Sequence, residues 1–519
     1  MDIHAPKMMD FGLRHVNLLY IWLLVATLSC IGTLTLAVYR LYFHPLARFP
    51  GPRLAAATNW YEVYYELVHK GGSQYAAKIR QLHAQYGPIV RINPGEISVN
   101  DAEFHDELYA PYPAVRYRDP SFSALLATNN GSFGTADHYI HRQRRIAYNP
   151  FFAASNLAAA EELMAQKVDH MCDLLWSRRE EQPNIWTYLA ALSFDSLFTM
   201  AFGRPLDLLD NLPLAQECNA TVELLATSPP VYRLFPGLVP LAEKLPVAIL
   251  RRLSVHIARV FNLHQLILQA AERSVQEKAD EKRSKSSPET LFSVIRRSKT
   301  TEDEKAISRM SHEGVEMFMA TFTSGRTMTH GLYYLHTHPD VLSTLRAEIA
   351  QVYPTSGDQM SFKTLNTMPY LRAVVKEILR ITFPVGCRVP MVCDESMNYG
   401  EWAIPANTSI SVNHRNLLFD PEVFVDPYKF CPERWLDEAH PIDEKRYFVV
   451  FGKGTRNCPG KEFATQLIQY TLATLLQRFE FQLSKDTIFE RDVKVSRESL
   501  VTSPSKESHG IKLSIMAKR

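Results

Sequence analysis

The densest group of chemically useful residues lies near the end of the chain, in the stretch Phe451–Gly460 (FGKGTRNCPG). Cys458 stands there two residues after Arg456, and an apolar helical pattern (EFATQLIQYTLATLL) follows. A cysteine binds metal as the thiolate, and a cationic neighbour together with peptide N–H groups at a helix start lowers its pKa. Gly454 and Gly460 allow the backbone to approach a flat cofactor closely. This stretch therefore predicts a thiolate site rather than a small buried hydrophobe.

The other cysteines have no comparable surroundings. The chain has seven cysteines, an odd number, and no CxxC pair. The remaining six are Cys30, Cys172, Cys218, Cys387, Cys393 and Cys431. This scatter argues against a disulfide framework or a zinc knuckle and favours a mostly reduced compartment.

The cysteine stretch resembles the haem-thiolate signature FxxGxRxCxG of the cytochrome P450 family. The matching residues are Phe451, Gly454, Arg456, Cys458 and Gly460. The resemblance implies that the cofactor is haem b and that Cys458 is the axial ligand of its iron. In such sites the thiolate pushes electron density through the iron and favours O–O cleavage.

Two upstream motifs resemble the same family in the same order. Glu377 and Arg380 are spaced i, i+3 on a helical pattern, which allows them to pair, and they resemble the family's ExxR motif. The segment Pro432–Trp435 (PERW) resembles the family's PERF/PERW, with Arg434 as its arginine. The resemblance implies a structural network of Glu377, Arg380 and Arg434 that holds the cysteine loop. Removing one member of such a buried network would leave the others unpaired.

Haem carries two propionates, which require cations at the rim of the site. By resemblance these are Arg456, Arg388 after the segment PVGC, and Arg145 in HRQRR, which resembles the family's WxxxR. His141 stands at the tryptophan position of that motif and could bond a propionate or simply pack at a helix face. No third ligand accompanies His138 and His141, so the sequence does not predict zinc there.

Above the iron, the family places a helix with the pattern A/G-G-x-D/E-T-T, whose acid and alcohol deliver protons. Counting back from Pro339 aligns residues 319–324 (MATFTS) with it. Thr323 then supplies the hydroxyl on the oxygen side, with Ser324 beside it. Phe322 stands where a carboxylate is expected.

A second register, four residues later, places Arg326 at the acid position and Thr327 after it. In both registers the usual acid is missing. An alternative for the hydroxyl groups is that they only bond back to carbonyl oxygens of their own helix.

The elements that must position these residues are mostly helical. Helical spacing of apolar residues covers 156–179, 249–285 and 311–336, while strand-like runs are short: IVRI and EISVN around Asn93-Pro94-Gly95, SISVNH from Ser409, and the tail near Ile511. The charged stretch 272–288 predicts a solvated helix end and surface loop. We therefore expect a mainly α protein with small β-sheets, and the resemblance implies the cytochrome P450 fold.

Residues 18–39 (LLYIWLLVATLSCIGTLTLAVY) carry no charge and are long enough to cross a bilayer, which needs about 20 residues. A cleaved signal peptide or a buried core helix are the alternatives, but the run exceeds a signal h-region and no clear cleavage pattern follows. Basic residues after it (Arg40, Arg48 and Arg53) place the body in the cytosol. We expect an anchor over 1–45 and one catalytic domain over 46–519, after a Pro-Gly-Pro break.

Composition excludes several classes of protein. The 519 residues are 46% hydrophobic and 22% charged, which is ordinary for a globular protein and allows either several domains or one large one. A formal net charge of +2 gives no basic field for nucleic acid. We predict a membrane partner and no nucleic-acid partner.

The resemblance covers the chain from Tyr39 onward and looks most like fungal microsomal, trichodiene-oxygenase-like members. It implies a single-pass protein of the endoplasmic reticulum membrane that hydroxylates or epoxidises a lipophilic terpenoid or polyketide. The chain after Cys458 is too short for a flavin domain, so electrons would come from a separate NADPH–cytochrome P450 reductase. Segments 112–135, 318–323, 383–387 and 500–504 would line the pocket, with Phe122, Phe318, Phe322 and Phe383 favouring an apolar ligand.

Two other functions stay open at this point. A haem-thiolate isomerase or dehydratase that needs no reductase is suggested by the missing acid at Phe322. A non-catalytic haem-binding scaffold is the other, and the hydroxyl retained at Thr323 argues against it.

Overall fold

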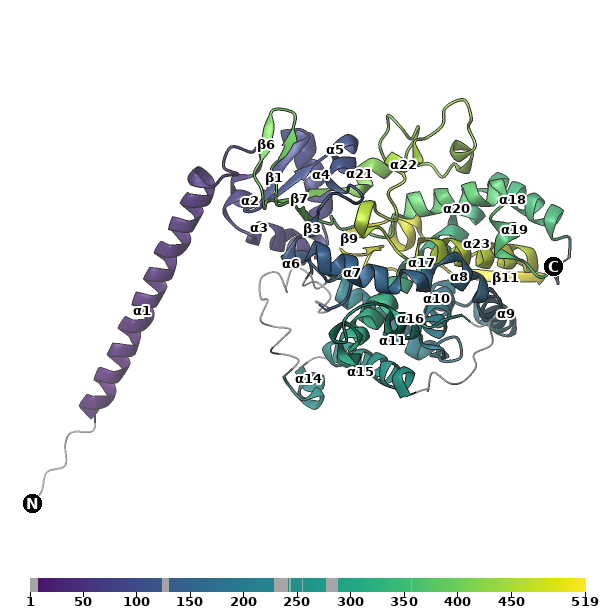
Figure 1. Ribbon diagram of the computed structural model, residues 1–519, viewed down its shortest axis with the longest axis horizontal. Coiled ribbons are helices and arrows are strands. Elements are labelled where there is room, and N and C mark those ends of the chain that lie inside the picture. The colour runs from purple at the N-terminus through teal and green to yellow at the C-terminus, as the bar shows by residue number, and fades with distance from the viewer. Residues whose placement is uncertain are drawn as a thin grey trace, which may run out of the picture.

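The computed structural model shows a helical body from which one long helix, α1 (Met8–Val38), projects (Figure 1). The structure describes residues 8–123, 130–227, 241, 244–253, 255–276, 288–355 and 357–519. Most of the predicted surface loop at 272–288 and the end of the helical pattern 249–285 lie outside these ranges.

Helices dominate the body, as the apolar spacing predicts. The longer ones are α4 (Tyr75–Tyr86), α7 (His138–Tyr148), α9 (Glu161–Ser177), α10 (Ile185–Phe202), α11 (Leu212–Thr227), α15 (Val255–Gln276), α17 (Ile307–Thr337), α18 (Pro339–Val352), α20 (Pro369–Thr382) and α23 (Lys461–Arg478). Shorter ones are α2 (Arg53–Ala57), α3 (Trp60–Val63), α5 (Ala102–Leu108), α6 (Pro120–Ser123), α8 (Ala154–Ala159), α14 (Val247–Leu253), α16 (Leu291–Arg297), α19 (Phe362–Leu365), α21 (His414–Leu418) and α22 (Glu444–Tyr447).

The strands are short and form small sheets. They are β1 (Ile89–Asn93), β2 (Glu96–Val99), β3 (Tyr117–Arg118), β4 (Met391–Val392), β5 (Met397–Tyr399), β6 (Trp402–Ile404), β7 (Ser409–Val412), β8 (Phe479–Leu483), β9 (Arg497–Glu498), β10 (Thr502–Ser503) and β11 (Leu513–Lys518). The largest sheet has the order β1-β2-β7-β4-β3. The predicted hairpin at Asn93-Pro94-Gly95 is its β1–β2 pair, and the fold is mainly α with small sheets, as expected.

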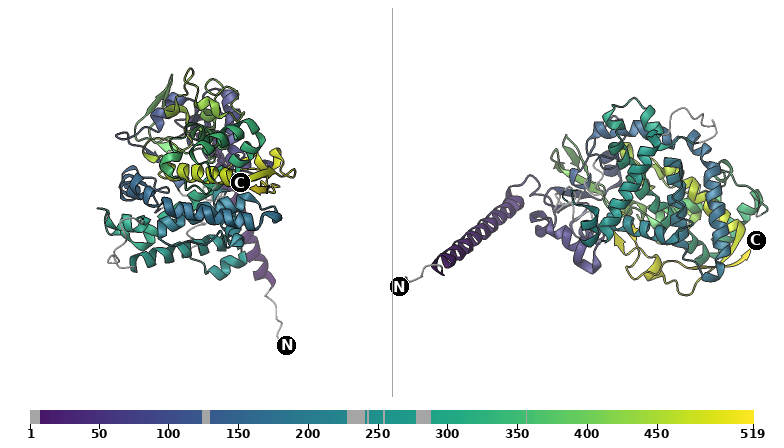
Figure 2. Two further views of the ribbon diagram at one scale, coloured as in Figure 1. Left: turned by 90° about the vertical axis from the view of Figure 1, so that its right-hand side faces the viewer. Right: turned by 90° about the horizontal axis from the view of Figure 1, so that it is seen from below.

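In the body of the molecule, from which α1 also projects in the turned views (Figure 2), α17 packs extensively against α10. Gly325 permits this approach, because a Cβ there would lie 2.8 Å from the Cα of Ala190 on α10. α10 itself is nearly all buried, starts with Asn184 accepting the N–H of Trp186, and ends at Gly203 in the left-handed region (φ +74°). α17 and α10 therefore form a rigid support for the residues of α17 that could face a ligand.

Local signals explain several helix starts near the site. Asp101 caps α5 by accepting the N–H of Phe104, and Asp137 caps α7 by accepting the N–H of Ile140. The helical pattern at 156–179 is split into α8 and α9, which meet at Ala160. No side chain caps α20 from within; Glu348 of α18 accepts the N–H groups of Tyr370 and Leu371, each at 2.8 Å.

The candidate membrane span covers Tyr20–Phe43, with a mean hydropathy of 2.1, and none of it is buried against the body. Large apolar side chains on it, such as Trp22 at 70% exposure, have no protein partner to cover them. This excludes the buried core helix for this segment. A second apolar helix, Ile185–Phe202, passes the same test but is 89% buried and is the core helix α10.

Removal of residues 1–38 tests the anchor. We expect the full chain to stay in the membrane pellet after an alkaline carbonate wash and most of the truncated chain to be released, because the helix alone supplies a bilayer-length apolar surface. Equal retention of the two chains, or extraction of the full chain, would contradict an anchoring role for α1.

Candidate functional site

The cysteine loop lies directly before α23. Cys458 donates its backbone N–H to the carbonyl of Phe451 at 2.7 Å, which closes the loop on itself. Gly454 has φ +69°, and a Cβ there would lie 2.1 Å from the carbonyl oxygen of Tyr109, so only glycine fits. Lys453 pairs with Asp106 on α5. The predicted residues Phe451, Gly454 and Cys458 thus belong to one tight turn pressed against α5.

The thiol of Cys458 sits at the N-terminal end of α23, as the sequence predicts. The side chain is accessible to solvent, yet surrounding protein raises the pKa of the thiol by burial. The N–H of Gly460 and the charge of Arg145 act in the opposite direction and lower that pKa. Because thiolate is the metal-binding form, a bound metal cation would complete the stabilisation that these two groups begin.

Glu377 is the centre of an ion network whose core, Glu377 and Arg380, is fully buried. Arg380 donates to both of its carboxylate oxygens, at 2.8 and 2.9 Å, and neither side chain is exposed. Arg434 donates to Glu377 at 3.2 Å, and the indole N–H of Trp435 donates at 2.9 Å. The backbone N–H of Cys431 adds a fifth bond at 3.1 Å. The structure therefore brings Glu377, Arg380 and Arg434 together and adds Trp435, whose role the sequence did not reveal.

This network reaches the cysteine loop through an aromatic chain. Trp435 packs edge-on against Phe448 with ring centres 5.2 Å apart, and Phe448 packs against Phe451 at 6.5 Å. On the other side, Arg380 donates to the carbonyls of Leu418 and Pro427 at 2.9 and 2.8 Å. The ion network thus fixes the segment that leads into the loop at Phe451.

A group of cationic residues lies beside the loop. Arg456 donates to the carbonyls of Thr135 and Ala136, at 2.7 and 2.9 Å, while its buried Nε has no partner among the described residues. Burial and then the charge of Arg118 lower the pKa of Arg456 to about 8. Arg145 donates to the side-chain oxygen of Asn457 at 2.9 Å. Two predicted propionate partners, Arg456 and Arg145, therefore lie against the cysteine loop.

Arg118 on β3 belongs to the same group, and the sequence did not single it out. Its guanidinium bonds the carbonyl of Phe133 and lies 4.2 Å over that ring, while its buried Nε lacks a partner among the described residues. Burial lowers its pKa to about 10. A two-residue strand gives no sequence signal for this placement, which depends on its pairing with β4.

His141 is buried among these arginines. Burial and the charges of Arg456, Arg118 and Arg145 lower its pKa to about 2, so the imidazole is neutral at physiological pH. A neutral imidazole could bond a propionate as a hydrogen-bond partner but not as a cation.

Arg388 differs from the other predicted cations. Its Nε bonds Glu96 at 2.6 Å and its Nη2 bonds Glu62 at 2.7 Å, and these two carboxylates raise its pKa. Its charge is thus largely balanced by these two carboxylates, and its contact with a propionate stays a prediction.

These residues fit haem b. A thiol at a helix start could bind the iron, and two buried arginines with unsatisfied Nε atoms match the charge of two propionates. Within the described ranges no group of three or more His, Cys, Asp or Glu residues could hold a separate metal ion.

On α17, the residues aligned with the oxygen-side pattern fall on different faces. Ala320 is exposed and Thr323 is half-buried, whereas Ser324 and Phe322 are buried. Thr323 donates its hydroxyl to the carbonyl of Ala320 at 2.9 Å, which is the bond back to its own helix considered from the sequence. Phe322 packs edge-on against Trp186 of α10 at 5.0 Å.

Arg326, the acid position in the second register, lies on that same packed side. Its guanidinium carbon is 5.0 Å from the ring centre of Phe322 and 5.2 Å from that of Trp186. Burial lowers its pKa to about 10. Two aromatic rings therefore contact this arginine, and Thr327, the hydroxyl of the second register, donates to the backbone carbonyl of Thr323 at 2.9 Å.

The segments expected to line a pocket are only partly described. Residues 124–129 within the segment 112–135 lie outside the described ranges. Phe122 packs against Phe133, and Phe318 packs against Phe194 on α10, with ring centres 6.0 and 4.4 Å apart. Phe383 is buried under Arg415. Phe318 and Phe322 thus serve the contact between α17 and α10 rather than an open pocket.

Comparison with known proteins identifies the family. The Cytochrome P450 family profile matches residues 56–509. The tryptophan 6-hydroxylase of Fusarium equiseti is 32% identical over 503 residues, which cover 96% of each chain. A cytochrome P450 monooxygenase of Ascocoryne sarcoides is 31% identical over 94% of this chain and 96% of its own. The conidiogenone synthase of Penicillium rubens is 30% identical over 92% and 96%, respectively.

The chain therefore belongs to the cytochrome P450 family. It is a cytochrome P450 monooxygenase of the kind found in fungal secondary-metabolite pathways, as the motifs at Glu377, Arg434 and Cys458 predict.

Replacing Glu377 tests the ion network. Glu377→Ala should lower the free energy of unfolding by about 3–5 kcal/mol, because it leaves two arginines buried without their carboxylate. Urea unfolding followed by circular dichroism measures this loss. Glu490→Ala, which breaks the exposed pair with Lys494 at 2.7 Å, is the control and should cost about 1 kcal/mol at most. Equal losses in the two variants would contradict the central position of Glu377.

Proposed function

We propose that the protein uses haem b, bound through the Cys458 thiolate, to hydroxylate or epoxidise a lipophilic terpenoid or polyketide. Electrons would come from a separate, membrane-bound NADPH–cytochrome P450 reductase. The observation that carries this proposal is a solvent-accessible thiol, held at the start of α23 by its loop, with buried and incompletely satisfied arginines beside it.

Bound haem would supply the activation of O₂ that lets one oxygen atom enter an unactivated C–H or C=C bond. The residues of this chain bind and orient it: Cys458 holds the iron, while Arg118, Arg145 and Arg456 neutralise the propionates. His141, as a neutral imidazole, would contribute a hydrogen bond to a propionate. Arg388 would contribute less charge than the others, because it already pairs with Glu62 and Glu96.

Proton handling on α17 would rest on Thr323. Its hydroxyl is on the more accessible face and can exchange its present bond to Ala320 for a bond to a water or a ligand. Ser324 is buried beside it and would support it. Because Phe322 closes the usual acid position against Trp186, we infer that the proton arrives from water rather than from a side chain at 322.

The chain would be divided into a membrane anchor, residues 1–45, and a catalytic domain, residues 46–519. The anchor would hold the protein in the endoplasmic reticulum membrane as a single-pass protein, with the catalytic domain in the cytosol. A lipophilic substrate would then reach the site from the bilayer.

The names of the relatives refer to different molecules. One relative is named for tryptophan and another for conidiogenone, so identity near 30% does not decide the substrate. We favour a terpenoid or polyketide and a place among trichodiene-oxygenase-like members, since the segments YRLYFHPLARFPGP and HRQRRIAYNPFF resemble that group.

A second function, a haem-thiolate isomerase or dehydratase, is favoured by one observation. The acid position is filled by Phe322, which is 1% exposed and packed against Trp186, so a protonation route usual for oxygen activation is closed. Such an enzyme would rearrange its substrate without NADPH.

The experiment that separates the two functions is reconstitution of the full chain with reductase and an extract of candidate intermediates. We expect product formation only with NADPH, reductase and O₂, and product heavier by one oxygen atom, labelled when ¹⁸O₂ is supplied. Unlabelled product formed without NADPH would favour the isomerase or dehydratase.

A hydroxyl variant tests the role of Thr323. Thr323→Ala should increase the NADPH consumed per product formed, because the site would lose general acid–base assistance. The control is Thr321→Ala, on the same helix, whose hydroxyl is buried and bonds Phe318 O at 2.7 Å. If both variants raise NADPH consumption equally, Thr323 has no special role.

A further inference from the structure

Two buried carboxylates of α17 bind a loop that also contacts the arginines of the site. Glu313 is completely buried and Glu316 is 9% exposed, and both point to the loop of residues 131–137 that precedes α7. Ser132 donates its backbone N–H and its hydroxyl to Glu313, at 3.1 and 2.6 Å. Phe133 and Gly134 donate their N–H groups to the two oxygens of Glu316, each at 2.8 Å.

The opposite side of this loop carries the arginines of the site. The carbonyl of Phe133 accepts from Arg118, and its ring lies under that guanidinium. The carbonyls of Thr135 and Ala136 accept from Arg456. The Phe133 residue is thus bonded to Glu316 by its N–H and to Arg118 by its carbonyl. A shift of this residue would move both partners.

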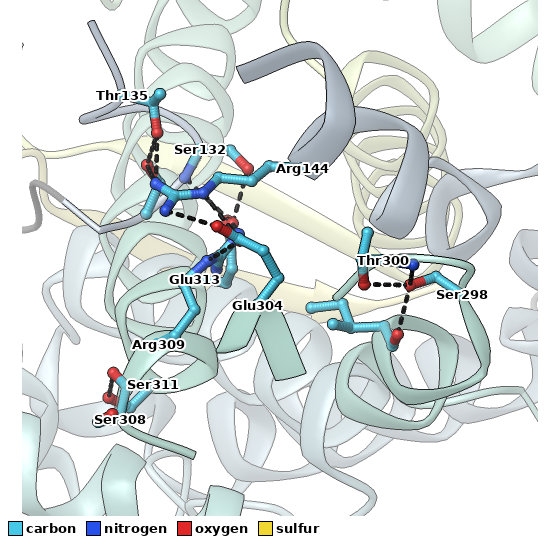
Figure 3. Close-up of polar contacts among 12 residues, drawn as sticks. Ser132, Thr135, Arg144, Ser298, Thr300, Glu304, Ser308, Arg309, Ser311 and Glu313 are labelled. Carbon is cyan, nitrogen blue, oxygen red and sulfur yellow. Dashed lines mark hydrogen bonds and ion pairs between the residues drawn. The ribbon is translucent and has the colours of Figure 1, made fainter. Parts of the chain in front are cut away.

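The loop is also tied at its ends (Figure 3). Arg144 of α7 donates to the hydroxyl of Thr135 at 2.7 Å and pairs with Glu304 at 2.9 Å. Arg309 bonds Glu304 at 2.6 Å and Glu313 at 2.8 Å. The ion network in Figure 3 therefore joins α7, the loop and the first turns of α17. Glu316 binds the same loop separately, through the N–H groups of Phe133 and Gly134.

We propose that Glu316, braced by Glu313, is a positioning residue that sets Arg118 toward the haem propionates through Phe133. This inference rests on the proposed haem site. Glu316 acts in two ways: it fixes the N–H groups of the loop, and it supplies a negative charge that balances the buried cation Arg118.

The test compares Glu316→Gln, Arg118→Leu and the double variant as full chains in detergent micelles. Each single variant should lose haem to a protein acceptor at least about tenfold faster than wild type, as expected for supporting residues of a metal site. The double variant should be no faster than Arg118→Leu, because Glu316 works through Arg118. Additive acceleration would overturn the proposal.

The midpoint potential gives a readout that a purely structural role would not move. Ferric haem carries one more positive charge than ferrous haem, so loss of the Glu316 charge should raise the potential and loss of the Arg118 charge should lower it. Glu316→Asp keeps the charge but shortens the side chain; it should speed haem loss and leave the potential at the wild-type value. If Glu316→Gln folds poorly, the rate of haem loss and the potential of Glu316→Asp still test the positioning role.

The matched control is Glu348→Gln, because Glu348 also accepts two backbone N–H groups at 2.8 Å but caps α20 instead. It should keep the wild-type potential and rate of haem loss. If Glu316→Gln behaves like this control, the positioning role is wrong while the proposed function stands. If wild type binds no haem through a thiolate, seen in its ferrous–CO spectrum, the proposed function itself fails.

Discussion

The carboxylate of Glu377 is the interaction on which the arrangement around Cys458 depends. It is fully buried and accepts bonds from two arginines, an indole and a backbone N–H. A buried charge of this kind is stable only when all its partners are present. Through Trp435 and Phe448 it fixes the chain that enters the cysteine loop, and Gly454 then presses that loop against α5.

A second set of charges, on Arg118 and Arg456 beside Cys458, is paired less completely. Around the loop the arginines bond mainly to backbone carbonyls, and their pKa values fall because burial outweighs the effect of the nearby carboxylates Asp137 and Glu316. The carboxylate of Glu377 has a full set of hydrogen-bond donors, whereas Arg118 and Arg456 each keep a buried Nε with no partner among the described residues and could bind an anion.

Features whose residues lie close together in the sequence, and motifs that follow one another in a fixed order along the chain, could be predicted. The helical pattern, the β1–β2 hairpin and the i, i+3 pair of Glu377 and Arg380 depend on local spacing, and the structure shows each of them. Arg118, Glu316 and Trp435 were missed because their roles depend on contacts between distant segments. Arg388 illustrates the same limit, since nothing near it in sequence indicates that Glu62 and Glu96 will pair with it.

The ferrous–CO spectrum of purified full-length protein tests the central claim most directly. Thiolate ligation by Cys458 predicts the red-shifted Soret band typical of the family in wild type and in the control Cys218→Ser, and its complete loss in Cys458→Ala. A wild-type protein without that band, or a Cys458→Ala variant that retains it, would contradict the assignment of Cys458 as the iron ligand.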